Sequence, residues 1–147
     1  MRIALGSDHR GLELKQYVIE LLGKLGHSYH DFGCYTPDPV DYPDVAREVG
    51  RAVAAGQFDR GVLICGTGIG MSMAANKIRG VRAALCSDVV AAQRSRQHND
   101  ANILCLGGEA MDSVTAAEIV KAYLSTQFEG GRHLRRVQKI QSLEECP

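Results

Sequence analysis

The stretch ICGTGIGMS, residues 64–72, places one cysteine directly before three glycines at every second position. Cys65 ends an apolar run and precedes a predicted helix, whose N-terminal dipole favours the thiolate form. A thiolate can attack an acyl group, or it can accept a proton from a carbon made acidic by an adjacent carbonyl. The residue types leave both chemistries open, beside a purely structural cysteine in the core.

The glycine loop itself suits an anion. Backbone N–H groups of Gly66, Thr67, Gly68, Ile69 and Gly70 can converge on a phosphate or a developing oxyanion. Dinucleotide-binding glycines belong after the first strand, where this chain reads SDHRG, and the Gly-Lys-Ser/Thr of a P-loop is absent. A tight turn that merely needs small residues is the alternative to a site, and nucleotide binding is not expected.

Two histidines are further candidates. His98, in SRQHND, closes a predicted helix, where the negative pole favours the imidazolium and suits a proton donor or a simple cap. His9 follows Asp8 and is either a cap partner or a substrate ligand. A metal set of Asp8, His9, His98 and Asp100 is conceivable, but its spacing matches no known zinc motif, so we expect no metal.

A basic terminal segment follows Gly130. Arg132 and Arg136 lie one helical turn apart, and guanidinium pairs suit phosphate. Leu134, Val137 and Ile140 share the other face of the predicted helix, which spans residues 131–145. We expect this helical arm to dock onto its own domain or onto a second copy at a dimer interface, in a homodimer or a dimer of dimers.

Short apolar runs alternate with helical patterns along the whole chain, which predicts an α/β fold. We expect a three-layer αβα domain with a five-stranded parallel sheet of order 2-1-3-4-5, Rossmann/flavodoxin-like. The predicted strands lie at residues 3–5, 29–32, 62–65, 83–86 and 103–106. Ligands bind at the carboxyl edge of such sheets where the order reverses, here between residues 7–11 and 65–68.

Composition limits the classes of function. The 147 residues make one domain, 1–147, with 45% hydrophobic residues and no linker or repeat. The 17 basic and 17 acidic residues balance, which argues against a nucleic-acid or membrane surface. Five cysteines without C-x-x-C spacing, and no signal peptide or membrane-length run, predict a reduced cytoplasmic protein.

Five collinear motifs carry a family resemblance. They are GSDHRG (6–11), DYPD (41–44), ICGTGIGMSMAANK (64–77), SRQHNDANIL (95–104) and EGGRHLRRV (129–137). Together they resemble the type B ribose-5-phosphate isomerases, in the superfamily that also holds galactose-6-phosphate isomerase. The resemblance covers essentially the whole chain and is less specific for the substrate.

The resemblance implies aldose–ketose isomerisation of ribose 5-phosphate and ribulose 5-phosphate through an enediolate, without metal or cofactor. It implies Cys65 as the catalytic base and His98 as the acid that opens the sugar ring. The remaining implied roles are sugar binding by Asp8, His9 and Asn99, enediolate binding by Gly66 to Gly70 with Thr67, and phosphate binding by Arg132 and Arg136.

One position departs from the family. After the fifth strand, relatives carry an arginine near the phosphate, whereas this chain has Glu109 in LGGEAMD. An acid there would repel a phosphate if it pointed inward, which keeps a hexose or tetrose phosphate open as the substrate. A Cys-His acyl-transfer enzyme and a sugar-phosphate binder without catalysis are the alternatives from other classes.

Overall fold

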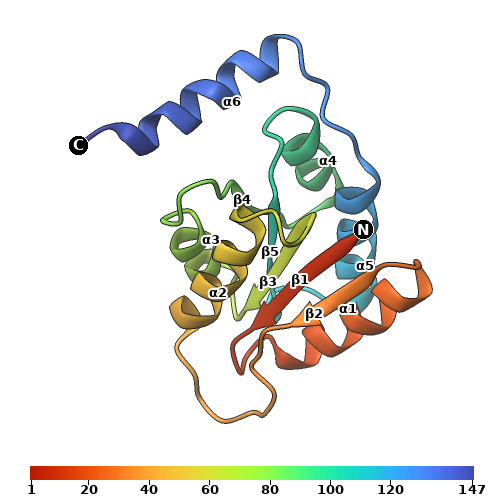
Figure 1. The fold of residues 1–147 in the computed structure, drawn as a ribbon. Coiled ribbons are helices and arrows are strands. Elements are labelled where there is room, and N and C mark those ends of the chain that lie inside the picture. The colour runs from red at the N-terminus through yellow and green to blue at the C-terminus, as the bar shows by residue number, and fades with distance from the viewer.

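A computed structural model describes all residues, 1–147, as a parallel sheet between two helical layers (Figure 1). The strands are β1 (Arg2–Ser7), β2 (Ser28–Asp31), β3 (Arg60–Cys65), β4 (Ala83–Leu85) and β5 (Ile103–Gly107). The helices are α1 (Leu12–Lys24), α2 (Tyr42–Ala54), α3 (Ile69–Ala75), α4 (Val89–Gln97), α5 (Ser113–Ser125) and α6 (Arg132–Ser142), followed by a 3₁₀ turn, η1 (Leu143–Glu145). The predicted α/β class is confirmed. No helix has the length and apolar character to cross a membrane.

The central strands are buried on both faces, as their unbroken apolar sequences predict. In β3, Val62 and Ile64 pack into one cluster with α1, α4 and α5, whereas Leu63 and Cys65 pack into the other with α2 and α3. All four residues are at most 4% exposed. Burying each aliphatic side chain stabilises the fold by about 1.5–3 kcal/mol, so these strands anchor the loops at their ends.

The predicted strand order is wrong at one edge. The observed order is β2-β1-β3-β5-β4, so β5 and not β4 pairs with β3. The five residues of β5 are all buried, while β4 has three residues, and Leu85 is 41% exposed. A short, partly exposed strand belongs at an edge and a fully buried one inside. The β1–β3 neighbourhood, on which the predicted site depends, is confirmed.

Local sequence signals set the helix ends. The Asp88 side chain accepts a hydrogen bond from the Ala91 N–H at 2.7 Å and caps α4. Pro43 lies in the first turn of α2, where its missing N–H costs nothing. In α1, Lys15 is only 1% exposed; its Nζ donates to Asp31 Oδ1 at 2.7 Å and to the Cys34 carbonyl. These bonds fix the start of the loop between β2 and α2.

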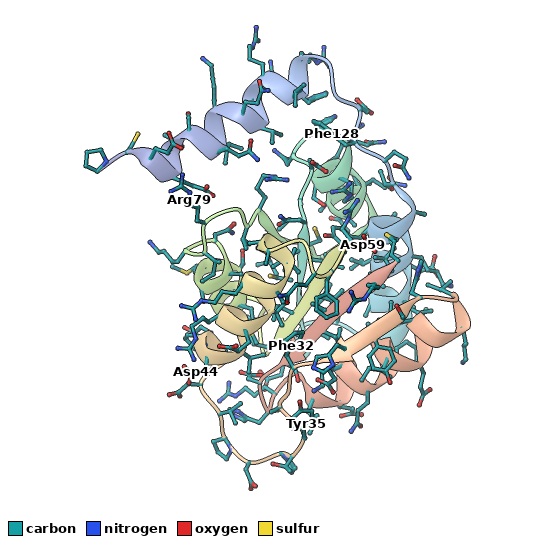
Figure 2. The ribbon with its side chains drawn as sticks, viewed as in Figure 1. Phe32, Tyr35, Asp44, Asp59, Arg79 and Phe128 are labelled. Atoms are coloured by element: carbon teal, nitrogen blue, oxygen red, sulfur yellow. The ribbon has the colours of Figure 1, made fainter.

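The terminal helix α6 lies apart from the three layers, beyond the amino ends of the strands (Figure 1). Its end is tied back by Arg79, which is labelled in Figure 2 and whose Nη2 lies 2.9 Å from Glu145 Oε1. The Gly80 N–H donates to Glu144 in the same segment. Val137 is buried, but Leu134 and Ile140 remain 45% and 44% exposed. The chain's own domain thus covers only part of the predicted apolar face.

Candidate active site

A cavity of about 550 Å³ opens at the carboxyl edge of the sheet, between the ends of β1 and β3. Its walls come from the segments after these two strands and from the start of α2. Seven residues singled out in the sequence line it, namely Asp8, His9, Cys65, Gly66, Thr67, Ile69 and Gly70. The sheet topology therefore brings the β1 and β3 candidates together, as the switch-point rule predicts.

Cys65 ends β3 and lies in the floor of this cavity, 4% exposed. Its Sγ accepts a hydrogen bond from the Gly68 N–H at 3.2 Å, and such a donor stabilises a thiolate more than a thiol. The loop can turn this sharply because Gly68 has φ 79°, and a Cβ there would lie 2.6 Å from Leu85. Ile69 and Gly70, in the first turn of α3, line the same cavity, and the Ile69 N–H donates to Thr67 Oγ1 at 3.2 Å.

Asp8 and His9 are held in the opposite wall. Asp8 Oδ1 accepts from the N–H groups of Arg10 and Gly11 at 3.0 and 3.1 Å, which leaves its other oxygen for a ligand. His9 Nδ1 accepts from the Val40 N–H at 3.3 Å. In the neutral ring this contact assigns the proton to Nε2, so His9 can donate a hydrogen bond from that atom.

Three further residues at this edge were not predicted as site residues. Arg10, Asp41 and Tyr42 line the cavity, and the Tyr42 ring packs so closely on Gly70 that a Cβ there would lie 2.6 Å from it. The only sequence signal for Asp41 and Tyr42 was the DYPD motif, which carried no assigned role. Their place depends on the path of the loop before α2, which a single sequence does not reveal.

Glu109 lies against the Cys65 loop. A Cβ on Gly66 would lie 3.1 Å from Glu109 Oε2, and the Glu109 N–H donates to the Gly66 carbonyl. Glu109 Oε1 is 3.8 Å from Arg10 Nε, with both side chains more than half exposed. The Glu109 carboxylate, which was expected to repel a phosphate, therefore lies next to the cavity and offsets the charge of Arg10.

His98 lies at the amino edge of the sheet, where the strands begin, and not at the carboxyl edge that holds Cys65. It caps the end of α4, which starts after the carboxyl end of β4 and runs back across the sheet. Asn102, four residues later, accepts a hydrogen bond from the Gly61 N–H at the amino end of β3. Cys65 ends that same strand, so one chain does not bring Cys65 and His98 together.

His98 is part of a compact cluster with the start of the terminal arm. Its ring stacks on His133 with 4.2 Å between centroids and 9° between planes. His133 Nε2 is 3.5 Å from Glu129 Oε2, and the Glu129 N–H donates to the Gln97 carbonyl. Burial, together with the charges of His98 and Arg132, lowers the pKa of His133, so we expect its imidazole to be neutral at pH 7.

The two candidate phosphate ligands lie on α6, which begins beside His98 at the amino edge. Arg132 and Arg136 are exposed on α6, and neither makes an ion pair or side-chain hydrogen bond within the chain. Asn99 is exposed beside His98, with its carbonyl accepting from Arg82 Nε at 3.2 Å. The predicted site residues therefore form two groups, one at each edge of the sheet.

The four residues Asp8, His9, His98 and Asp100 do not come together as a metal site. Asp8 and His9 line the carboxyl-edge cavity, whereas His98 and Asp100 lie at the amino edge. Asp100 instead pairs with Arg96 at 2.8 Å and with Arg82 at 3.4 Å. His98 comes close to a different pair, Glu129 and His133.

Comparisons with known proteins agree with this architecture. A family model described as Ribose/Galactose Isomerase matches residues 3–140. The chain belongs to this family of sugar isomerases. The isomerase is 47% identical over 146 residues to a putative sugar phosphate isomerase of Bacillus subtilis, covering 99% of this chain and 98% of the relative. It is 46% identical over 144 residues to ribose-5-phosphate isomerase B of Escherichia coli, covering 98% and 97%.

Solved structures give the same result for the fold. Ribose-5-phosphate isomerase B of Clostridium thermocellum matches this isomerase with a TM-score of 0.97 and 48% identity, over 99% of this chain and 98% of that one. The type B enzyme of Trypanosoma cruzi matches with a TM-score of 0.97 and 43% identity over all of both chains. The three-layer sheet and the terminal arm are therefore features that this isomerase shares with its relatives.

Proposed function

We propose that the protein is an aldose–ketose isomerase that interconverts ribose 5-phosphate and ribulose 5-phosphate without a metal. The observation that carries the proposal is the Cys65 thiol, which accepts the Gly68 N–H in the floor of a cavity beside Asp8 and His9. The near full-length similarity to relatives named ribose-5-phosphate isomerase B supports the choice of substrate.

Cys65 acts as the base in this mechanism. Its thiolate removes the proton from C2 of the open-chain aldose, and the electrons form an enediolate across C1 and C2. The first N–H groups of the Gly66–Gly70 loop stabilise the negative oxygen, as backbone donors do in an oxyanion hole. The thiol then returns the proton to C1, while the proton of the O2 hydroxyl passes to O1. C2 thereby becomes the carbonyl of the ketose. Asp8 and His9 hold the sugar hydroxyls.

Ring opening needs an acid, and we assign it to His98 of a second subunit. The carboxyl-edge cavity contains neither His98 nor the arm arginines, and the amino edge carries all three. A two-fold dimer that places the amino edge of one chain over the carboxyl edge of its partner completes both sites. Arg132 and Arg136 then bind the substrate phosphate, and Asn99 contacts the sugar.

Exposed apolar side chains support such a dimer. Leu134 and Ile140 on α6 are left uncovered, and Ile69 and Met73 beside the Cys65 loop are 52% and 66% exposed. Water-exposed apolar groups of this size near both halves of a site are typical of a surface that packs against another molecule. The arm and the loop would cover each other.

A turnover screen tests the substrate and the metal independence together. Ribose 5-phosphate, allose 6-phosphate, galactose 6-phosphate and erythrose 4-phosphate are assayed with the full-length protein, each with and without a chelator. We expect the highest kcat/KM with ribose 5-phosphate and no loss on chelation. A clear preference for a hexose or tetrose phosphate would correct the substrate, and activity that one added divalent ion restores would overturn the metal-free mechanism.

A further inference from the structure

We propose that His98, Glu129 and His133 form a binding site for a divalent transition-metal ion of the Zn²⁺ type. One ligand atom from each residue lies within 4.8 Å of the other two. Two imidazoles and one carboxylate are a ligand set that Zn²⁺ accepts in proteins, with a fourth position open to water. Nothing in the proposed isomerase chemistry uses Glu129 or His133.

The distances are close to those of a bound ion. With Zn–N near 2.0–2.1 Å, tetrahedral ligands lie about 3.3 Å apart. His133 Nε2 and Glu129 Oε2 are already 3.5 Å apart, so this pair needs almost no movement. The His98 nitrogen must approach by at most about 1.5 Å. The two stacked rings, 9° from parallel, must also tilt apart so that the ion can lie in the plane of each ring.

The fold brings the main chain of these three residues close together. Glu129 is fixed by its N–H, which donates to the Gln97 carbonyl at 3.1 Å, next to His98 in the chain. His133 lies in the first turn of α6, 5% exposed, and its ring lies flat against that of His98. Ligands that the fold has ordered lose little freedom on binding, which favours affinity.

Binding has a consequence for the enzyme that rests on the proposed function. An ion that takes a lone pair of the His98 imidazole prevents this ring from exchanging the proton that opens the sugar. We therefore infer that Zn²⁺ inhibits the isomerase reversibly through this cluster, although the reaction itself needs no metal. Mg²⁺ prefers oxygen ligands and is not expected to bind.

Calorimetry on the chelator-treated full-length protein tests the site without reference to activity. We expect one Zn²⁺ per chain and no binding of Mg²⁺, with affinity at least ten-fold lower in Glu129→Gln and His133→Gln. The controls are His27→Gln, a histidine remote from the cluster, and Cys65→Ala, which removes the thiol of the proposed catalytic loop. Unchanged affinity in Glu129→Gln, or lost affinity in Cys65→Ala, would overturn the assignment.

A second readout does not depend on the folding of a variant with a substituted buried histidine. Co²⁺ added to the unmodified protein should give visible d–d absorption without a sulfur-to-cobalt charge-transfer band; a sulfur band would contradict the cluster. In the activity assay, Zn²⁺ should inhibit at concentrations near its measured Kd. In Glu129→Gln, the inhibitory concentration should rise by the same factor as the Kd for Zn²⁺. Binding with undiminished turnover would refute the inhibition and the role of His98, and would leave the metal site standing.

Discussion

Subunit mixing gives the sharpest test of the two-edge arrangement. Cys65→Ala removes the proposed base from the carboxyl edge, and the double variant Arg132→Ala/Arg136→Ala removes the proposed phosphate ligands from the amino edge. Each protein alone has every site damaged. In a hybrid dimer, one site combines Cys65 of the arginine variant with both arginines of the Cys65→Ala chain. That site has all its groups.

The expected rescue follows from the symmetry. Random exchange of equal amounts makes about half of all dimers hybrid, and one of the two sites in each hybrid is intact, so about a quarter of the parental activity returns. The background is low, because losing two charged hydrogen-bond partners at about 1.5–3 kcal/mol each reduces kcat/KM by about two to four orders of magnitude. Rescue is therefore readily measured.

The assay follows ketose formation from ribose 5-phosphate after the two proteins are mixed. Exchange is established in parallel by native mass spectrometry of tagged and untagged chains. As a control, Cys65→Ala is mixed with a second carboxyl-edge variant, Asp8→Ala, which should give no rescue because each hybrid still has both sites damaged. Absence of rescue in the first mixture, with hybrids demonstrably present, would refute a site shared between edges.

Four further outcomes are expected. Cys65→Ala should abolish turnover yet still bind sugar phosphate in calorimetry. Cys65→Ser should be almost as inactive, because a hydroxyl is too weak an acid to supply the base. Near-normal turnover of either variant would exclude the proton-carrier role. Arg132→Ala alone should raise KM more than it lowers kcat, a result that equal use of unphosphorylated ribose by the parent enzyme would contradict. Glu109→Gln should strengthen phosphate binding by less than about 1 kcal/mol, since its partner Arg10 is exposed; weaker binding would mean that Glu109 contacts the sugar. Lys15→Met should lower the free energy of unfolding by about 2–4 kcal/mol in urea titration. This loss is smaller than for a fully buried ion pair, because the partner carboxylate of Asp31 is partly exposed. An unchanged unfolding midpoint would refute that stabilising role.

The sequence predicted the fold well because its signals are local. Apolar runs and helical stripes define the elements, and the arm helix lies where expected. The predicted strand order was wrong at β4, because its run AALC has the same apolar character as a buried strand although Leu85 is 41% exposed. Which of two such strands lies inside is decided by packing, which no local pattern records.

The sequence indicated many of the candidate residues but not how the fold arranges them. The end-of-strand rule placed Asp8 beside Cys65, because both follow neighbouring parallel strands. The same rule could not show that His98, at the end of a returning helix, lies at the other edge. His133 and Glu129 were missed altogether, since their proximity to His98 depends on how the Gly130–Gly131 turn folds the arm back.

The separation of the two edges has a consequence for how activity depends on concentration. If each chain carries a base at one edge and an acid with phosphate ligands at the other, an isolated chain holds every necessary group and no working centre. Specific activity should then fall on dilution below the dimerisation constant, by mass action. Newly made chains would stay inactive until they meet a partner, so the rate of assembly would set when activity begins.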